Sequence, residues 1–313
     1  MKSIVDSFNT KDDVSLGKFL KEVENNTPLS VEILKESYIR KGKAHIIGIT
    51  GPPGAGKSTL VSKMCKVLAK QGLSIGIVCV DPTSPFTQGA LLGDRIRMQE
   101  LSKLPNVFTK SLATRGNLGG LAASTADIVN VIDAYEKDVI LVETVGVGQV
   151  EFEIMKVADT VALVNVPGLG DSLQTLKGGI MEIADLYVIN QADRPGANES
   201  VRDLKMMVRE LGKTDWQRPV LKTIATSEEG IEELIEKIHE HREYLQNSEL
   251  WKNKREDRNI TILKNIVLGL LSDEAREMIQ SNKELQAKIE EVKYGRLDPI
   301  TVSHEIVNNL VSK

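Results

Sequence analysis

Short apolar runs recur between residues 44 and 225, and segments of helical length separate most of them. Continuous apolar runs of this length are typical of strands that are buried on both faces. Strands that alternate with helices predict an α/β fold, in which helices flank a mostly parallel sheet. The runs lie at 44–50, 73–80, 138–144, 159–166, 186–190 and 219–225, with a further candidate strand at 107–113.

Both ends of the chain lack this alternation and are predicted to be helical. Residues 12–42 have the spacing of two polar helices, with Pro28 at the entry to the second. Beyond about residue 226 the strand pattern stops. We therefore expect three regions: an N-terminal helical extension (1–43), a central P-loop domain (44–245) and a C-terminal helical region (246–313).

Four helices are predicted after about residue 226, and the last three of them form the C-terminal region. Thr226 and Glu229 match a capping box that would begin a helix reaching about residue 245. Three further helical stretches follow near 257–280, 283–293 and 299–311. The first of these carries an apolar stripe that would pack either against its own domain or against a second subunit. The stripe consists of Ile260, Leu263, Ile266, Val267, Leu270 and Leu271.

Composition and charge narrow the possible partners. The chain has 40 basic and 44 acidic residues in mixed order and a formal charge of −4, so nothing favours nucleic acid or an anionic membrane. Cys65 and Cys79 are interpreted as reduced core residues of an intracellular protein. The first residues lack the apolar stretch of a signal peptide, and no apolar run approaches the ~18 residues of a membrane span. We expect a soluble cytoplasmic protein.

A phosphate-binding motif lies between the first predicted strand and the helix that follows it. GPPGAGKST, residues 51–59, matches Gly-x-x-x-x-Gly-Lys-Ser/Thr in the context that this motif requires. Its glycines let consecutive backbone N–H groups converge on phosphate oxygens at the positive end of the helix. The Lys57 ammonium would reach the β- and γ-phosphates, and the Ser58 hydroxyl would bind Mg²⁺. The predicted nucleotide contacts are Gly51, Pro52, Pro53, Gly54, Ala55, Gly56, Lys57, Ser58 and Thr59.

Three acids at or beyond strand ends are candidates for the metal and for hydrolysis. Glu143 ends the run 138–144, and Gly146 follows where a backbone N–H can sense the γ-phosphate in P-loop proteins. Asp81 ends another strand, and Asp94 lies in the long loop after it. All three acids cannot bind Mg²⁺ directly if the ion keeps water and phosphate ligands. Some would therefore act through water or on the attacking water molecule.

The stretch INQADRP, residues 189–195, ends a predicted strand with the Asn-x-x-Asp arrangement by which GTPases recognise guanine. Asp193 would accept from the N1 and N2 groups of guanine, which adenine does not offer, and Asn190 would tie this loop to the base and the P-loop. Leaving a buried carboxylate unpaired is costly, so such a site discriminates between bases. Gln191 stands where lysine is usual and is expected to pack more weakly on the base. A second base-contacting loop is expected at Ile224, Ala225 and Thr226.

Together these residues resemble the SIMIBI class of P-loop GTPases, and within it the MeaB/ArgK/MMAA family. Members of this family are GTPase chaperones of adenosylcobalamin-dependent acyl-CoA mutases, and methylmalonyl-CoA mutase is the type partner. The likeness covers nearly the whole chain. It is carried by GPPGAGKST, VDPTSPFTQGALLGDRIRM, ATRGNLGGLA, ETVGVGQVE and PGLGDSLQTLKGGIMEIAD, of which the last is the most specific because a generic GTPase does not require it.

The resemblance implies GTP or GDP and Mg²⁺ as ligands, a mutase as partner, and a homodimer formed through the C-terminal helices. It also implies that residues 165–180 form an additional switch that moves on contact with the mutase. Within that switch, Lys177 is the residue expected to stimulate hydrolysis. The candidate catalytic residues are Lys57, Asp81, Asp94, Glu143 and Lys177, and those near Mg²⁺ are Ser58, Asp81, Asp94 and Glu143.

The sequence favours a GTP-hydrolysing mutase chaperone that gates cofactor loading and protection over two other functions. An ATP-dependent kinase or ATPase, the older amino-acid transport label of some relatives, would need an acceptor pocket with a general base, and no such motif occurs. A metallochaperone GTPase would need a cluster of metal ligands. The four histidines and two cysteines are scattered and form no such motif.

Overall fold

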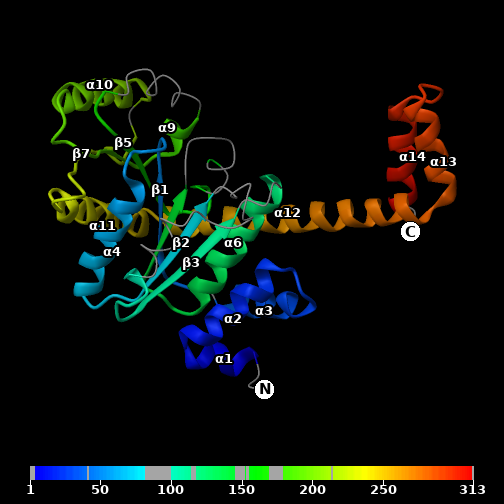
Figure 1. Cartoon of the computed structure of the whole chain (residues 1–313), viewed down its shortest axis with the longest axis horizontal. Coiled ribbons are helices and arrows are strands. Elements are labelled where there is room, and N and C mark those ends of the chain that lie inside the picture. Colours follow the sequence, from blue (N-terminus) through cyan, green and yellow to red (C-terminus); the bar gives the residue numbers. More distant parts are fainter. Residues whose placement is uncertain are drawn as a thin grey trace. The chain divides into compact units, whose positions relative to one another are not determined.

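The computed structural model describes residues 4–40, 42–81, 100–113, 118–144, 152, 155–168, 179–212 and 214–311. The chain divides into two compact units, Met1–Lys254 and Arg255–Lys313, and the first contains the sheet (Figure 1). The expected division into three regions at 43/44 and 245/246 stays a prediction. No helix in the described parts of the chain combines the length and the apolar character that crossing a bilayer requires.

Seven parallel strands form one sheet in the order β3-β2-β4-β1-β5-β6-β7. Every residue of β1, β4, β5 and β6 is buried, because helices cover both faces of a parallel sheet of this kind. Each strand lies on one of the predicted apolar runs, so the predicted fold class is confirmed. The strands are β1 (His45–Thr50), β2 (Ile75–Asp81), β3 (Val107–Ala113), β4 (Val139–Thr144), β5 (Thr160–Asn165), β6 (Leu186–Ile189) and β7 (Val220–Lys222).

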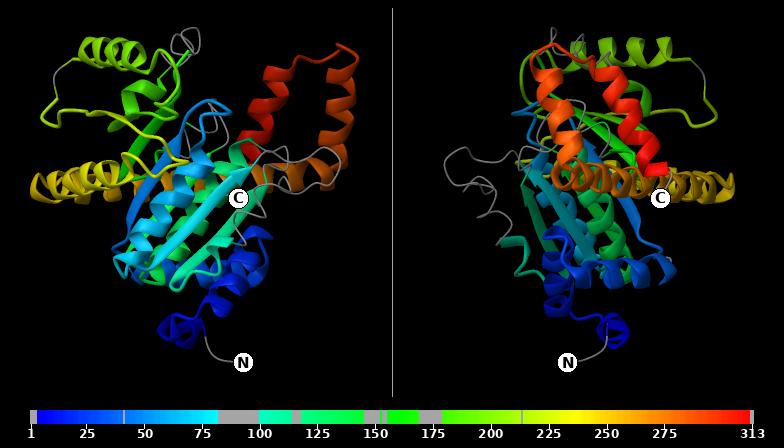
Figure 2. Two further views of the ribbon diagram at one scale, coloured as in Figure 1. Left: turned by 60° about the vertical axis from the view of Figure 1, so that its left-hand side comes forward. Right: turned by 90° about the vertical axis from the view of Figure 1, so that its right-hand side faces the viewer.

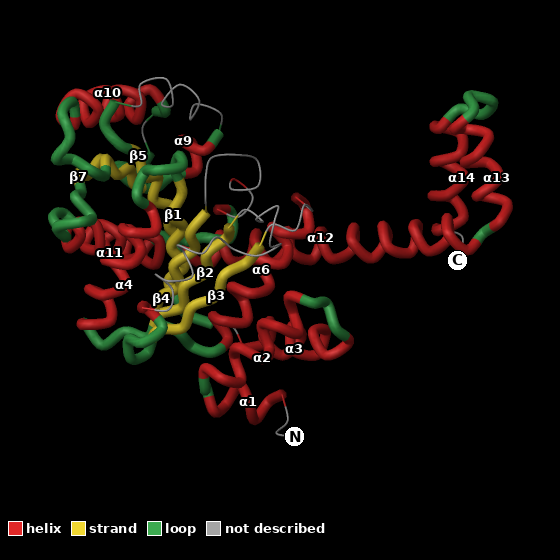
Figure 3. Tube along the Cα trace, in the orientation of Figure 1, coloured by secondary structure: helices red, strands yellow, loops and turns green. Residues whose placement is uncertain are grey.

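Helices lie on both faces of the sheet, as the tube in Figure 3 shows. α4 (Lys57–Lys70) contacts β1, β2 and β4 and packs beside α11 (Ile231–Asn247), which contacts β5. α6 (Leu118–Ala134) covers β2 and β4 from the other face. α9 (Ile180–Ile183) precedes β6, and α10 (Ala197–Glu210) contacts β6 and β7 at one end of the sheet.

The predicted capping box at Thr226 and Glu229 is wrong. α11 begins at Ile231 after Gly230, whose backbone is left-handed, and no side chain caps the helix. The Glu229 carbonyl instead accepts from the Ile224 N–H at 3.0 Å and so closes a turn. A capping box would instead place Glu229 inside the first turn of the helix, whereas the helix begins two residues later.

Three helices precede the sheet. α1 (Ile4–Thr10), α2 (Asp13–Glu24) and α3 (Pro28–Arg40) pack together, and α2 and α3 contact α6. Phe8 of α1 lies with its ring centroid 4.8 Å from that of Tyr135, just after α6. α1 was not predicted, because seven residues are too few for a helical period to stand out.

The C-terminal helices are α12 (Leu250–Ser281), α13 (Lys283–Lys293) and α14 (Pro299–Val311). α13 and α14 have the predicted bounds, while α12 begins several residues earlier than predicted. The predicted apolar stripe of α12 is 45–66% exposed.

Both cysteines are free thiols in the core, as predicted. Burial raises the pKa of Cys65 in α4 to about 12. The Cys65 thiol therefore stays protonated and unreactive at neutral pH.

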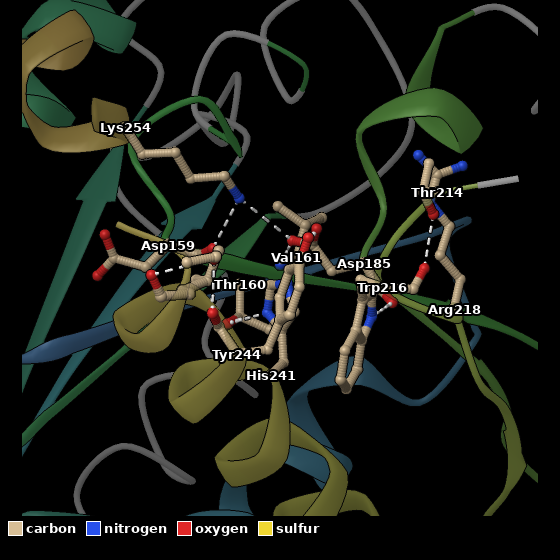
Figure 4. Close-up of polar contacts among 12 residues, drawn as sticks. Asp159, Thr160, Val161, Asp185, Thr214, Trp216, Arg218, His241, Tyr244 and Lys254 are labelled. Carbon is tan, nitrogen blue, oxygen red and sulfur yellow. Dashed lines mark hydrogen bonds and ion pairs between the residues drawn. The ribbon is translucent and has the colours of Figure 1, made fainter. Parts of the chain in front are cut away.

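A polar network, buried at His45, Thr160 and His241, joins α11 and the start of α12 to the amino ends of β1, β5 and β6 (Figure 4). The Thr160 hydroxyl lies 2.7 Å from His45 Nε2 and 2.8 Å from His241 Nδ1. His241 Nε2 lies 3.4 Å from Asp185 Oδ1. Lys254 Nζ donates to the Asp159 carbonyl at 3.0 Å. These groups lie at the opposite ends of the strands from the predicted site residues.

Candidate nucleotide-binding site

The described site residues follow the carboxyl ends of the parallel strands and therefore lie at one edge of the sheet. Figure 2 shows the sheet from two sides. The P-loop, residues 51–56, joins β1 to α4, and Glu143 lies near the end of β4. Asn190 follows β6, and residues 224–226 follow β7. This edge is where ligands bind in open parallel sheets.

Two glycines allow the P-loop to lie against neighbouring strands. Gly51 has a φ of 142°, and a Cβ there would come within 1.9 Å of the Val164 carbonyl oxygen in β5. Gly56 has a φ of 80°, and a Cβ there would lie 2.5 Å from Asn190 Nδ2. Only glycine satisfies both the backbone conformation and the space at these positions.

α4 begins directly after this loop, at Lys57, and no side chain caps its amino end. The first N–H groups of a helix and its dipole favour an anion at this place. The Lys57 side chain is buried, and its Nζ donates to the carbonyls of Gly51 at 2.8 Å and Pro52 at 3.0 Å. The ammonium is therefore held inside the loop that is predicted to surround the phosphates.

A hydroxyl and a carboxylate meet beside the start of α4. The Ser58 hydroxyl donates to Glu143 Oε1 at 2.6 Å, across 85 positions of the chain. Glu143 is only 6% exposed, and its Oε2 lies 3.7 Å from Cys79 Sγ, the residue opposite it in the β2–β4 register. Hydroxyl and carboxylate oxygens are the ligands that Mg²⁺ prefers.

These oxygens fit a magnesium ion that shares its coordination with phosphate and water. Among the described residues no group of three or more His, Cys, Asp or Glu side chains could hold a metal by itself. Mg²⁺ in nucleotide sites is typically bound through one or two protein oxygens together with phosphates and waters. Ser58 and Glu143 are the described residues that would supply the protein oxygens.

Asn190 is 1% exposed and joins three segments at the carboxyl edge. Its Nδ2 donates to the Ala55 carbonyl of the P-loop at 2.8 Å. Its Oδ1 accepts from the Thr223 hydroxyl at 3.0 Å and from the Ala225 N–H at 3.2 Å. Asn190 thus holds the P-loop, the end of β6 and the segment after β7 together, as its predicted tie to the P-loop requires.

The other base-site candidates surround Asn190. Gln191 Nε2 donates to the Gly54 carbonyl at 3.2 Å, so its side chain reaches the P-loop. Asp193 lies in the turn after β6, and its side chain is exposed. In the same turn the Ala192 N–H donates to the Thr223 carbonyl at 3.1 Å. Ala225 is buried and Thr226 is exposed.

Several predicted residues lie outside the part of the chain that the structure describes. They are Asp94, Gly146 and Lys177, together with most of the predicted switch at 165–180. The backbone of Asp81 ends β2, but its side chain is also outside the description.

Two residues of the site were not predicted. Thr223 supports Asn190 from the end of β7, and Cys79 faces Glu143 from the neighbouring strand. Aligning the ends of the apolar runs at 73–80 and 138–144 would have brought Cys79 close to Glu143. No comparable signal marks Thr223, because a threonine at a strand end is common.

Comparison with known proteins agrees with this geometry. A family model described as "Methylmalonyl Co-A mutase-associated GTPase MeaB" matches residues 16–280. A Pyrococcus abyssi protein named as a candidate GTPase is 47% identical over 315 aligned positions, which cover 98% of this chain and 96% of the relative. The Escherichia coli GTPase ArgK is 34% identical over 231 positions, 70% of this chain and 69% of ArgK.

A solved structure shows the same fold. The crystal structure of an LAO/AO transport system kinase matches with a TM-score of 0.73 at 24% identity and covers 98% of this chain and 97% of that one. Family model and relatives agree on guanine-nucleotide binding and GTP hydrolysis. The chain belongs to the MeaB family of methylmalonyl-CoA mutase-associated GTPases.

Proposed function

We propose that this GTPase is a chaperone of an adenosylcobalamin-dependent acyl-CoA mutase, with methylmalonyl-CoA mutase as the first candidate. Its nucleotide state would gate the loading of the cofactor and protect the cofactor from inactivation. The observation that carries the proposal is the match of residues 16–280 to a family described as associated with that mutase. The phosphate-binding geometry around Lys57 and Glu143 supports the nucleotide half of the proposal.

We assign the phosphate chemistry to the P-loop and to Glu143. Bound phosphates would replace the Gly51 and Pro52 carbonyls as partners of the Lys57 ammonium. Mg²⁺, when bound, neutralises charge that develops on the phosphate oxygens. Ser58 and Glu143 would hold the ion, and the proposed roles of Asp81, Asp94 and Lys177 in hydrolysis rest on the sequence alone.

We assign base recognition to the loops after β6 and β7. Asp193 would accept two hydrogen bonds from guanine, while Asn190 holds both loops against the P-loop. Adenine presents an acceptor where guanine presents its N1–H, so the carboxylate would be left without a donor. This arrangement favours GTP over ATP as substrate.

Coupling to the mutase requires that the GTP and GDP forms bind it with different affinities. Linkage then makes the mutase alter nucleotide affinity by the same factor. We place the responsive segment at 165–180, which follows directly from β5. The exposed apolar stripe of α12 supports a homodimer formed through the C-terminal helices.

The test uses the purified chain, purified methylmalonyl-CoA mutase and two nucleotide states. We expect binding with GDP and with a non-hydrolysable GTP analogue at different affinities, and faster GTP hydrolysis when the mutase is present. Failure to bind in either state would exclude this mutase. Hydrolysis of ATP at the same rate as GTP would exclude guanine recognition by Asp193 and would favour the kinase or ATPase interpretation instead.

A further inference from the structure

Gln191 links the base-side loop to the P-loop. Its backbone is left-handed, with a φ of 56°, and its Nε2 donates to the Gly54 carbonyl 137 positions away at 3.2 Å. A left-handed conformation costs a non-glycine residue of order 1 kcal/mol. The turn around Gln191 is maintained by the Ala192 N–H, which bonds to Thr223, and by the Arg194 N–H, which bonds to the Gln191 carbonyl at 3.0 Å.

The contact with Gly54 alone orients the amide of Gln191 within the described structure. Its Oε1 is buried and has no hydrogen-bond partner among the described residues. By contrast, both ends of the neighbouring Asn190 amide are bonded. What position 191 supplies to the P-loop is therefore a hydrogen-bond donor.

The peptide group that Gln191 contacts is also hydrogen-bonded within the P-loop. The Gly54 carbonyl belongs to the same peptide as the Ala55 N–H, which donates to the Pro52 carbonyl at 3.3 Å. The Pro52 carbonyl also accepts from Lys57 Nζ at 3.0 Å. Consecutive hydrogen bonds polarise and align one another. A path of hydrogen bonds thus leads from Gln191 through the Gly54–Ala55 peptide to the Pro52 carbonyl, inside the loop that is predicted to surround the phosphates.

We propose that Gln191 is a positioning residue that aligns the phosphate-binding loop through the Gly54–Ala55 peptide. Base-side and phosphate-side binding are then linked through the contact of Gln191 with the P-loop. The inference rests on the proposed nucleotide site. If the inference is correct, a substitution at position 191 should change the affinity for a ligand that has phosphates but no base. A residue that contacted only the base would not have this effect.

The experiment compares GDP with inorganic pyrophosphate, each in Mg²⁺, by calorimetric titration. Gln191→Met keeps a side chain of similar length and removes the donor, whereas Gln191→Lys retains a donor. We expect Gln191→Met to weaken the binding of both ligands roughly fivefold, equivalent to the ~1 kcal/mol of one hydrogen bond, and Gln191→Lys to bind pyrophosphate within about twofold of the wild type. Because a lysine stem is expected to pack better on the base, Gln191→Lys should bind GDP at least as tightly as the wild type. Asp193→Asn is the matched control in the same loop and should weaken GDP without affecting pyrophosphate.

The proposal is overturned if Gln191→Met leaves pyrophosphate affinity unchanged, or if Gln191→Lys loses as much affinity as Gln191→Met. Equal melting temperatures of the variants ensure that the comparison reports on the loop and not on unfolding. A wild-type chain that bound pyrophosphate but showed no preference for GDP over ADP would refute the proposed base recognition. The pyrophosphate comparison of the two Gln191 variants would still decide the coupling.

Discussion

At the scale of single residues, the pair formed by Ser58 and Glu143 lies at the proposed metal side of the site. The Glu143 carboxylate is buried and accepts a 2.6 Å hydrogen bond from the Ser58 hydroxyl. The other carboxylate oxygen faces Cys79. Glu143 is thus held in one orientation beside the start of α4.

Glu143→Gln tests this metal assignment. The amide oxygen can still accept from Ser58, but the negative charge that would attract Mg²⁺ is gone. Changes of this kind around a metal typically cost tenfold or more in metal affinity, so we expect roughly tenfold more Mg²⁺ for half-maximal GTP hydrolysis. Titrating Mg²⁺ at saturating GTP measures this, and an unchanged midpoint would remove Glu143 from the metal site.

Asp193→Asn tests base reading. The amide N–H₂ group of asparagine can donate to the O2 atom of xanthine. In guanine the same position carries the N2 amino group, so two donors would face each other. GDP affinity should fall at least about tenfold, as for a lost charge-assisted hydrogen bond, while xanthosine diphosphate affinity rises. Competition between the two nucleotides provides the measurement, and unchanged GDP affinity would mean that Asp193 does not read the base.

At the scale of elements, two polar contacts hold helices in place, one between two helices and one between a helix and the sheet. The Tyr38 hydroxyl of α3 donates to Asp127 Oδ1 of α6 at 2.9 Å. Burial raises the pKa of Asp127 from 3.8 to about 6, while the hydrogen bond from Tyr38 partly offsets this. In the second contact, His241 of α11 packs between Thr160 and Asp185.

Asp127→Asn should stabilise the fold at neutral pH. Between pH 3.8 and about 6 the folded state of the wild type binds more protons than the unfolded state, so its stability falls as the pH rises through this window. Asparagine keeps an acceptor for Tyr38 without the charge. We expect a gain of up to about 3 kcal/mol at pH 7 that disappears below about pH 4, measured by urea denaturation at both values. A variant less stable at pH 7 would contradict this.

His241→Gln should flatten the loss of stability in acid. Burial, aided by the Lys254 ammonium, lowers the pKa of His241 from 6.5 to about 3. The unfolded chain therefore binds more protons below pH 6.5, and wild-type stability is lost as the pH falls from there toward 3. Burial raises the pKa of Asp185, whose opposing effect is common to both proteins. The free energy of unfolding of the wild type and of His241→Gln is measured by denaturation at pH 7 and pH 5, and the wild type should lose more stability between the two. Equal losses in both proteins would refute the role of His241.

At the scale of the whole molecule, the chain consists of two compact units, and the stripe on α12 is exposed. A stripe of large apolar residues left in water favours association with a second apolar surface. The proposed homodimer would bury this stripe.

Leu263→Glu should therefore disrupt the proposed dimer. Leu263 is 61% exposed, so the substitution removes little packing within the chain and its effect should fall on association. Leu268→Glu is the matched control, because Leu268 is 63% exposed but lies off the stripe by helical spacing. Sedimentation should show a dimer for the wild type and for Leu268→Glu and a monomer for Leu263→Glu. A monomeric wild type would exclude the dimer.

Local pattern was sufficient to determine the strands, most helices and the P-loop. Strands that are buried on both faces are continuously apolar, so the runs around β1, β4 and β6 were visible without any knowledge of their neighbours. The context of GPPGAGKST identified the phosphate loop, and the Asn-x-x-Asp motif located Asn190 at a strand end. The resemblance of these motifs to known GTPases led to the family that the comparisons confirm.

Only the tertiary structure decided which of these residues meet. The Ser58–Glu143 bond, the link from Gln191 to Gly54 and the Thr160–His241 contact each join positions 81 or more residues apart. Such contacts depend on strand order and register, which place the ends of β2, β4, β1 and β6 at one edge. A local pattern carries no information about that order, because the same apolar run can pair with any neighbour.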